Sequence, residues 1–452
     1  MFNNIKKAST AMLVISMVTG CGASVGNEKV KDKELVISTY FPSPYLETVV
    51  KQFEKEHPDV EVTIEAFKEF GEPTRVSEGI EVPGQDMNPE RTLENYITYL
   101  NTAFMGNTAL DLLMLSWLPE YKYAQSGYLV DLTSYIEGTS QLTDKQYYMN
   151  VLKSSTYKEN IYAIPVGFDV TMVGINEKAM IKAGIDEAAI NGEYWDYKSM
   201  EKLLDTAPNK EEVYLQNGDA NSLFHDKYGL EEEQFIQIED KVVNFDNGQF
   251  IQLLKECKAA EDKGLLYNGE FENQAENSLF ANCLGGRRYC LYQPEYIGHA
   301  GDMNYTKPRM NEEGKIELNA TSEIAITKDA KDQALCWELI QTMLSEEMQK
   351  SPEVDGIPVN KNAAFMRNTE TAKTLKKELR HEGLKLQKEP EEIANELKEA
   401  LEKWVSIPYI KKSVIEIDDV VYEETEQFFK GNKSAEEVAQ KIQTKVYTML
   451  NE

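Results

Sequence analysis

The sequence predicts an α/β fold in which a parallel sheet is wrapped by helices. Three strand patterns predict it: a buried run at Leu35–Tyr40, an alternating one at Val60–Ala66 and a third at Leu112–Leu115. Helical spacing separates them, first with apolar residues at positions 46, 49, 50 and 53 and then over Leu93–Met105. Strands that alternate with helices favour parallel pairing, because a parallel connection needs a crossover of this length.

The remaining elements follow in order along the chain. Between the second strand and its helix, Gly71–Arg91 is rich in Gly, Pro, Glu and Asn, and we expect an inserted surface loop. A second unit is expected after Ile161–Ile175. Its predicted helices lie at the aromatic-rich start Tyr194–Leu204, around Phe250–Cys257, at Ala334–Leu344, in the charged and solvated stretch Thr371–Lys403, and after a capping box formed by Ser434 and Glu437.

Composition limits the partners of this chain. Of 452 residues, 41% are apolar, and 77 acidic residues against 48 basic ones give a formal charge of −29. This composition is that of a globular protein and excludes a collagenous, disordered or multi-span membrane chain. The negative field repels polyphosphate and anionic lipid, so nucleic acid is not expected as a partner and membrane attachment needs a specific anchor.

The N-terminus has the pattern of an export signal. Lys6 and Lys7 precede the short apolar stretch Ala8–Val18, which is well below the ~20 residues of a membrane-spanning helix. The following Thr19-Gly20-Cys21 resembles the bacterial lipoprotein lipobox. The resemblance implies removal of residues 1–20 and diacylation of Cys21, which meets the two-chain condition for stable anchoring. The alternative is an ordinary secretory signal that contains a cysteine.

The other cysteines predict neither a disulfide framework nor a metal centre. Cys257, Cys283, Cys290 and Cys336 are too sparse to act as a framework. Cys283 and Cys290 could pair locally, but buried free thiols remain an equal alternative. No Cys-x-x-Cys occurs and the four histidines are scattered, so neither a zinc site nor any other cofactor is expected.

Eight segments resemble a known family in their order along the chain. They include "LVISTYFPSPYLETVVKQFEKEHPDVEVTI", "YAQSGYLVDLT", "YAIPVGFDVTMVGINEKAMIKAGI" with Pro165 and Asn176, "GIPVNKNAAF" and the closing "GNKSAEEVAQKIQTKVYTMLNE". Over roughly residues 35–452 the chain is similar to the bacterial extracellular solute-binding proteins of family 1, the group that contains maltose-binding protein.

The resemblance implies a two-lobe, periplasmic-binding-protein-like α/β fold of type II. Each lobe has a central mixed sheet flanked by helices, and a hinge joins the two. We expect lobe one at 35–167 plus 326–400 and lobe two at 168–325 plus 401–452, behind a tether at 21–34. The first crossover is expected near Gly167–Val170.

Ligands of open α/β sheets lie beyond the carboxyl ends of the strands, and this rule selects the candidate binding residues. They are Tyr40 and Phe41, Trp117 and Glu120, Phe168 and Asp169 at the crossover, and Tyr292, Glu295 and Tyr296 in lobe two. The resemblance implies aromatic contacts in the last two areas and near Trp404. Aromatic rings pack on the C–H faces of sugars while polar groups bind the hydroxyls, so the set predicts a carbohydrate site.

Several of these residues have an ordinary structural alternative. Trp117 lies two residues before Pro119, and local packing is its alternative; for Asp169 the alternative is a hydrogen bond within the hinge. Trp404 ends a charged helix, where it would cap a core. Trp195 and Trp337 lie within helical patterns, and we expect both in the core.

The expected function is that of a lipid-anchored receptor. It captures a carbohydrate, with an oligosaccharide favoured, by hinge closure and delivers it to the permease subunits of an ABC importer. We expect a monomer, held to the membrane through Cys21, that catalyses no reaction. An extracellular carbohydrate-active hydrolase is the alternative, and it needs two carboxylates ~5–10 Å apart. No sequence motif marks such a pair, and a sensor or adhesin on the same scaffold is a third possibility.

Overall fold

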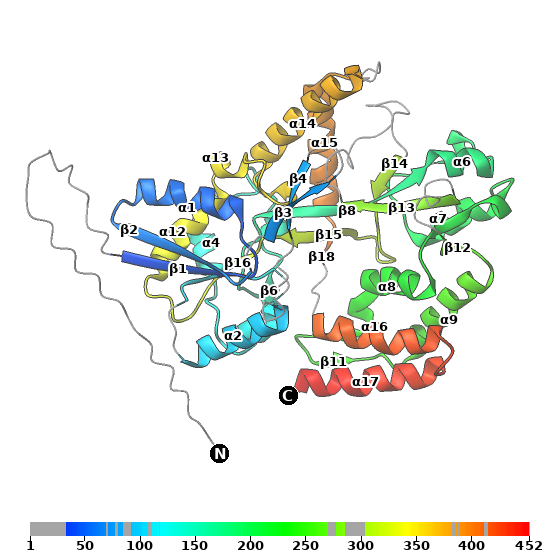
Figure 1. Ribbon diagram of the computed structural model, residues 1–452, viewed down its shortest axis with the longest axis horizontal. Helices are drawn as coiled ribbons and strands as arrows, with labels where there is room; N and C mark the ends of the chain where they lie inside the picture. Colours follow the sequence, from blue (N-terminus) through cyan, green and yellow to red (C-terminus); the bar gives the residue numbers. More distant parts are fainter. Residues whose placement is uncertain are drawn as a thin grey trace, which may run out of the picture.

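The computed structural model places the elements in two groups that lie side by side (Figure 1). The first sheet and its helices lie on the left, and the second sheet with the helices α6–α9, α16 and α17 on the right. The structure describes residues 33–68, 71–76, 80–84, 92–106, 110–116, 118–190, 192–269, 277–284, 303–381, 386, 388–410 and 415–451.

The first sheet has four strands in the order β16-β5-β1-β2. Its strands are β1 (Lys33–Thr39), β2 (Val60–Ala66), β5 (Leu112–Met114) and β16 (Ile324–Ile326). β1 pairs in parallel with both β2 and β5, which confirms the predicted parallel arrangement, and β16 returns antiparallel to β5. The predicted helices between these strands are α1 (Pro44–Glu56) and α2 (Leu93–Gly106).

Side-chain alternation sends neighbouring residues of β1 to opposite faces of this sheet. Leu35 and Ile37 join the core under α1 and α12 (Gln333–Leu344), whereas Val36 joins the core under α2. The buried face of α1 includes the predicted Leu46, Val49, Val50 and Phe53. Helices cover this sheet on both faces, which explains why the sequence of β1 contains an almost unbroken apolar run.

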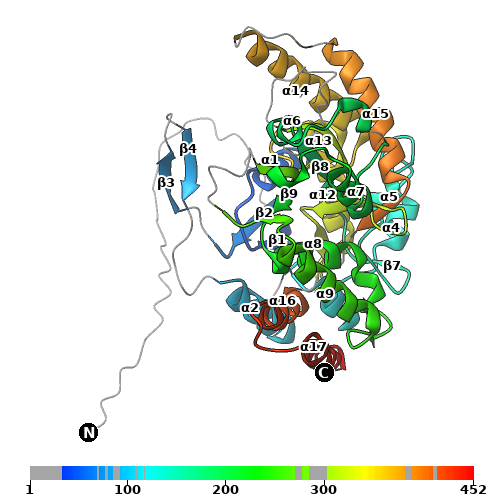
Figure 2. The ribbon, with the colours of Figure 1, turned by 90° about the vertical axis from the view of Figure 1, so that its right-hand side faces the viewer.

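The insertion after β2 differs from the prediction. We expected a surface loop over Gly71–Arg91, but this stretch contains an antiparallel hairpin of β3 (Gly71–Val76) and β4 (Ile80–Gly84). Figure 2 shows the hairpin standing apart from the rest of the molecule. The sequence analysis did not predict these two strands because they are short and carry glycine and proline, which lower strand propensity.

The second sheet has β8 at its centre, in the order β12-β9-β13-β8-β15-β18, with β14 and β17 also paired to β8. Strand β8 is buried along its whole length. The strands are β8 (Gly167–Asn176), β9 (Tyr214–Asn217), β12 (Leu266–Tyr267), β13 (Ser278–Leu284), β14 (Met303–Pro308), β15 (Ile316–Thr321), β17 (Ile357–Pro358) and β18 (Pro408–Ile410).

Helices cover the second sheet and build a separate layer below it. The helices of this half are α6 (Glu177–Ala183), α7 (Tyr197–Asp205), α8 (Ala220–Glu231), α9 (Gly248–Asp262), α16 (Ile415–Phe429) and α17 (Ala435–Asn451). α8, α9, α16 and α17 enclose one apolar cluster centred on buried phenylalanines. The expected capping box opens α17: the Glu437 N–H donates to Ser434 Oγ at 3.2 Å, and the Ser434 N–H donates to Glu437 Oε2 at 2.8 Å.

Short elements complete the described fold. The hairpins β6 (Thr156–Tyr157) with β7 (Asn160–Ile161) and β10 (Ile236–Gln237) with β11 (Val242–Val243) lie outside the two large sheets. The remaining helices are α3 (Glu120–Gln125), α4 (Thr133–Gly138), α5 (Met149–Leu152), α13 (Glu346–Gln349), α14 (Lys361–His381) and α15 (Pro390–Val405). α14 and α15 form the expected charged helices, and each also buries one apolar face.

The remaining core predictions have clear outcomes where the structure describes the residues. Trp195 is 2% and Trp337 6% exposed, so both belong to the core as predicted. Cys257 and Cys336 are buried free thiols, and burial raises the pKa of Cys257 to about 12. The side chains of Cys283 and Cys290 lie outside the described residues. In the described ranges, no helix combines the length and apolarity needed to cross a bilayer.

Candidate functional site

The parallel strands of the first sheet end at an edge that faces the second lobe (Figure 1). Backbone pairing continues past the ends of β1 and β2. The Phe67 N–H donates to the Thr39 carbonyl at 2.9 Å, and the Lys68 N–H donates to the Tyr40 carbonyl at 2.8 Å. The two loops that follow these strands therefore start side by side.

Five aromatic rings gather at this edge, and we call them the aromatic platform: Tyr40, Phe41, Phe67, Tyr96 and Tyr99. The Tyr40 ring lies 4.6 Å from that of Phe41 and 5.5 Å from that of Tyr96, between centroids. Phe67 lies 5.2 Å from Tyr96 and 6.1 Å from Tyr99. These separations are typical of interacting aromatic pairs, so the rings hold one another in place.

The platform has a buried base and an exposed top. Tyr96 is fully buried and Tyr40 is 7% exposed, whereas Phe41 and Tyr99 are each 37% exposed. The hydroxyl of Tyr96 shares a hydrogen bond with Ser38 Oγ at 2.9 Å, which satisfies the buried polar end of that ring. Exposed rings on a rigid base form a surface on which an apolar face of a ligand can stack.

Two charged groups border the platform. The Lys68 ammonium lies 5.2 Å from the ring centroid of Tyr40 and 5.3 Å from that of Phe41. The Tyr99 hydroxyl donates to Glu65 Oε2 at 3.3 Å. Burial raises the pKa of Tyr99, and the Glu65 carboxylate raises it further, so Tyr99 stays a hydrogen-bond donor at neutral pH. The edge therefore offers ring faces, a cation and an anion together.

Glu120 is half-buried and opens α3, the helix that bridges the two lobes. Next to it, Tyr121 packs against the apolar cluster of the second lobe, and Lys122 Nζ lies 3.2 Å from Glu416 Oε1 on α16. A second contact joins the lobes nearby, where the Lys158 N–H donates to Glu239 Oε2 at 3.0 Å. The two lobes thus touch directly at these two places.

Asp169 lies in β8 close to the chain segment before β17, and it is 7% exposed. Two glycines make this close approach possible. A Cβ on Gly167 would lie 2.3 Å from the Asp355 carbonyl oxygen, and one on Gly356 would lie 2.6 Å from the Phe168 carbonyl oxygen and 3.4 Å from Asp169 Oδ1. Asp169 is therefore a buried residue of the crossover strand, and its contact with a ligand stays a prediction.

Phe168 does not fit the expected role in this structure. It is fully buried, and its ring packs edge-on against Tyr148 with 5.3 Å between centroids. The strand's alternation sends Phe168 into the core, so its ring has no surface to offer a ligand.

The other predicted binding residues stay predictions. Trp404 is half-buried and packs against the core around α15, which matches its structural alternative. Trp117, Tyr292, Glu295 and Tyr296 lie outside the described residues, as does the lipidation candidate Cys21. Tyr40 and Phe41 are thus the predicted residues that the structure brings together.

The sequence analysis missed Phe67, Lys68, Tyr96 and Tyr99. The signal for the first two was present, because they directly follow the strand Val60–Ala66 and the carboxyl-end rule applies to that strand as well. Tyr96 and Tyr99 share one face of a helix at spacing three, a pattern that does not tell a core face from a binding face.

Comparisons with known proteins agree with this architecture. The family model described as "Bacterial extracellular solute-binding protein" matches residues 91–377, which is more than half of the chain. The chain belongs to the bacterial extracellular solute-binding protein family. This membership and the fold confirm the family resemblance and the two-lobe α/β prediction. The lobe boundaries remain predictions.

Solved structures of this kind share the fold over nearly the whole chain. The sugar-binding protein MalE of Xanthomonas citri has a TM-score of 0.62 and 16% identity, over 92% of this chain and 97% of that one. A sugar transporter protein of Rhizobium etli in an open conformation has a TM-score of 0.58 and 11% identity, over 91% and 98%. An ABC substrate-binding protein of Listeria monocytogenes, solved with cycloalternan, has a TM-score of 0.55 and 16% identity, over 93% and 99%.

Proposed function

We propose that this chain captures a carbohydrate, with an oligosaccharide favoured, for an ABC importer. The observation that carries the proposal is the aromatic platform at the carboxyl edge of the first sheet. Its exposed rings, Phe41 and Tyr99, suit the C–H face of a sugar, and Glu65 and Lys68 suit its hydroxyls. Solved relatives of the same fold that bind cycloalternan, maltose or tagatose support a sugar as the ligand.

Capture then works by closing the lobes on the ligand. A sugar stacked on the platform faces the second lobe, where Tyr292, Glu295 and Tyr296 are the proposed contacts. Closure is stabilised only by interactions that the ligand makes in the closed form and lacks in the open form. The further proposed contacts are Asp169 at the crossover, Trp117 and Glu120 after the third predicted strand, and Trp404.

A thermal-shift and calorimetric screen over neutral oligosaccharides tests this proposal. A ligand at 100 times its Kd should raise the free energy of unfolding by about 2.7 kcal/mol. Chromatography of the recovered sugar separates capture from hydrolysis, because a receptor returns the saccharide intact. Absence of any saccharide that binds, or release of cleaved products, would reject the proposal.

The closed form should also be more compact. Small-angle scattering with a saturating saccharide is expected to give a smaller radius of gyration than scattering without it. An unchanged radius with bound ligand would reject capture by closure.

The predicted export signal supports the proposed location, which is the outer face of the cell membrane with lipid on Cys21. Two acyl chains on one residue are enough for stable attachment. We expect the wild-type protein in the membrane fraction and the variant Cys21→Ser in the soluble or precursor fraction. Equal membrane attachment of both would contradict the anchor. The permease subunits of the importer are the proposed partners, and a monomer is the proposed state.

A further inference from the structure

Lys68 has an unusual environment for a lysine in so acidic a protein. The chain carries 77 acidic side chains against 48 basic ones, and many of the lysines in the structure lie within 4.0 Å of a carboxylate. Within the part of the chain that the structure describes, Lys68 has no such carboxylate partner, and its side chain contacts ring faces instead. A half-buried cation held over aromatic rings keeps part of its hydrogen-bonding capacity for another group.

The position of Lys68 is set by the backbone. Its N–H donates to the Tyr40 carbonyl at 2.8 Å, two residues after Ala66, at which the pairing of β2 with β1 ends. The two rings below it limit the directions that the side chain can take. Its ammonium lies 5.3 Å from the centroid of the exposed Phe41 ring, so a sugar stacked on Phe41 comes within reach of it.

We propose that Lys68 selects a saccharide that carries a carboxylate, so that the ligand of this site is a uronate-containing sugar. This inference rests on the proposed function and adds the substrate class. A uronate differs from its neutral counterpart at C6, where a carboxylate replaces a hydroxymethyl group. An ammonium binds the carboxylate by a charge-assisted hydrogen bond, which is stronger than its bond to a hydroxyl.

The negative charge of the chain disfavours anionic ligands in general, but it does not prevent a carboxylate from binding in contact with Lys68. Ionic screening acts over about 8–10 Å, so most of the acidic surface contributes little at the platform. Glu65, which borders the platform, accepts a hydrogen bond from the Tyr99 hydroxyl at 3.3 Å. It is placed to accept hydrogen bonds from sugar hydroxyls, while Lys68 supplies the cation.

The test uses matched saccharide pairs that differ only at C6: di-galacturonate with α-1,4-galactobiose, and cellobiouronate with cellobiose. Calorimetry on the wild-type protein should give a Kd for one uronate at least about tenfold lower than for its neutral partner. Lys68→Met, which keeps the length of the side chain, should remove this preference. Lys68→Arg should retain most of it, because a guanidinium also binds carboxylates.

The control variant is Lys255→Met. It removes one positive charge in the second lobe, where Lys255 Nζ lies 2.7 Å from Glu436 Oε1, and should leave the preference unchanged. Circular dichroism and the unfolding midpoint without ligand check that all variants are folded. Raising the salt concentration should weaken uronate binding more than neutral binding.

Two results would overturn the inference: a wild-type protein that binds no uronate more tightly than its neutral partner, or a folded Lys68→Met that keeps the preference. Tight binding of neutral sugars without a preference for uronates would reject only the proposed role of Lys68 and would leave the proposed function intact. Absence of binding by every neutral and acidic saccharide rejects the proposed function as well.

Discussion

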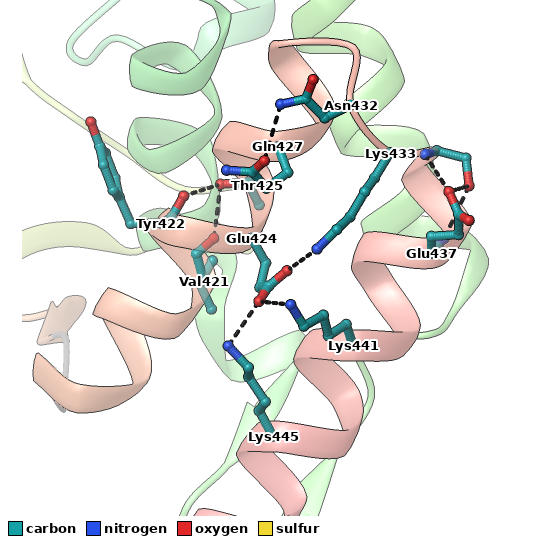
Figure 3. A network of polar contacts seen from close by, with 11 residues as sticks. Val421, Tyr422, Glu424, Thr425, Gln427, Asn432, Lys433, Glu437, Lys441 and Lys445 are labelled. Atoms are coloured by element: carbon teal, nitrogen blue, oxygen red, sulfur yellow. Dashed lines mark hydrogen bonds and ion pairs between the residues drawn. The ribbon is translucent and has the colours of Figure 1, made fainter.

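Glu424 on α16 offers the sharpest test of how the second lobe is held together (Figure 3). Its side chain is 4% exposed and contacts three lysines: Lys433 Nζ at 2.8 Å, Lys441 Nζ at 2.6 Å and Lys445 Nζ at 2.8 Å. The first lysine precedes α17 and the other two lie on it. One carboxylate therefore joins α16 to α17, and the variant Glu424→Gln removes its charge while keeping its shape.

The magnitude follows from the pKa of this carboxyl group. Burial alone would raise the pKa of Glu424, but the hydrogen bonds from the three lysines outweigh it and lower the pKa from 4.5 to about 2. A shift of this size corresponds to at most about 3 kcal/mol of stability. The lysine side chains are 29–47% exposed, and solvent screening reduces the expected contribution to about 2 kcal/mol.

The pH dependence has a definite sign. Because the pKa is lower in the folded state than in the unfolded state, the contribution is complete above pH 4.5 and disappears as the pH falls toward 2. Urea unfolding followed by circular dichroism should show Glu424→Gln about 2 kcal/mol less stable than wild type at pH 7. The difference should shrink steadily below pH 4.5.

Glu426→Gln is the matched control on the same helix. Glu426 is 37% exposed and contacts one lysine, Lys430, at 2.7 Å, so its loss should cost less than about 0.5 kcal/mol. The reasoning fails if the two variants are equally stable at pH 7. It also fails if the deficit of Glu424→Gln is as large at pH 2.5 as at pH 7.

Three further predictions concern the platform, the contact between lobes and the crossover. Phe41→Ala should raise the Kd for a bound saccharide about tenfold in calorimetry. The fold should not change, because Phe41 is 37% exposed. An unchanged Kd would remove Phe41 from the site. Lys122→Glu should increase the radius of gyration of the ligand-free protein in small-angle scattering, because Lys122 Nζ lies 3.2 Å from Glu416 Oε1. Adding Glu416→Lys should restore the wild-type radius. An unchanged radius in the single variant would contradict a role of this ion pair in holding the lobes together. Gly167→Ala should lower the free energy of unfolding by more than about 2 kcal/mol, because the new Cβ would lie 2.3 Å from a backbone carbonyl oxygen. The control Gly138→Ala should leave the free energy of unfolding nearly unchanged, because no atom lies within 4 Å of the position of its Cβ.

Local patterns in the sequence predicted the three parallel strands of the first sheet and several of the longer helices. The alternation in Val60–Ala66 and the spacing of Leu46, Val49, Val50 and Phe53 reflect periods of two and 3.6 residues, which depend only on the chain itself. The hairpin β3–β4 escaped prediction because its pairing depends on two short strands meeting, and neither strand has a strong pattern of its own.

The candidate site was predicted only in part, for a physical reason. Tyr40 and Phe41 were selected because the carboxyl-end rule favours residues that directly follow a strand. Tyr96 and Tyr99 lie more than 50 residues further along the chain and reach the same place through the packing of α2 on the sheet. Phe168 was misplaced because the side of β8 that it faces depends on the neighbours of that strand.

The sequence by itself determined the alternation of strands and helices in the first sheet, its parallel pairs, the capping box of α17 and the family resemblance. Periodicity, capping and chain order are local properties, and they persist whatever the rest of the chain does. The tertiary structure alone decided which side chains share a surface. It placed Lys68 over two rings and surrounded Glu424 with three lysines, because such contacts join residues through packing that no local pattern records.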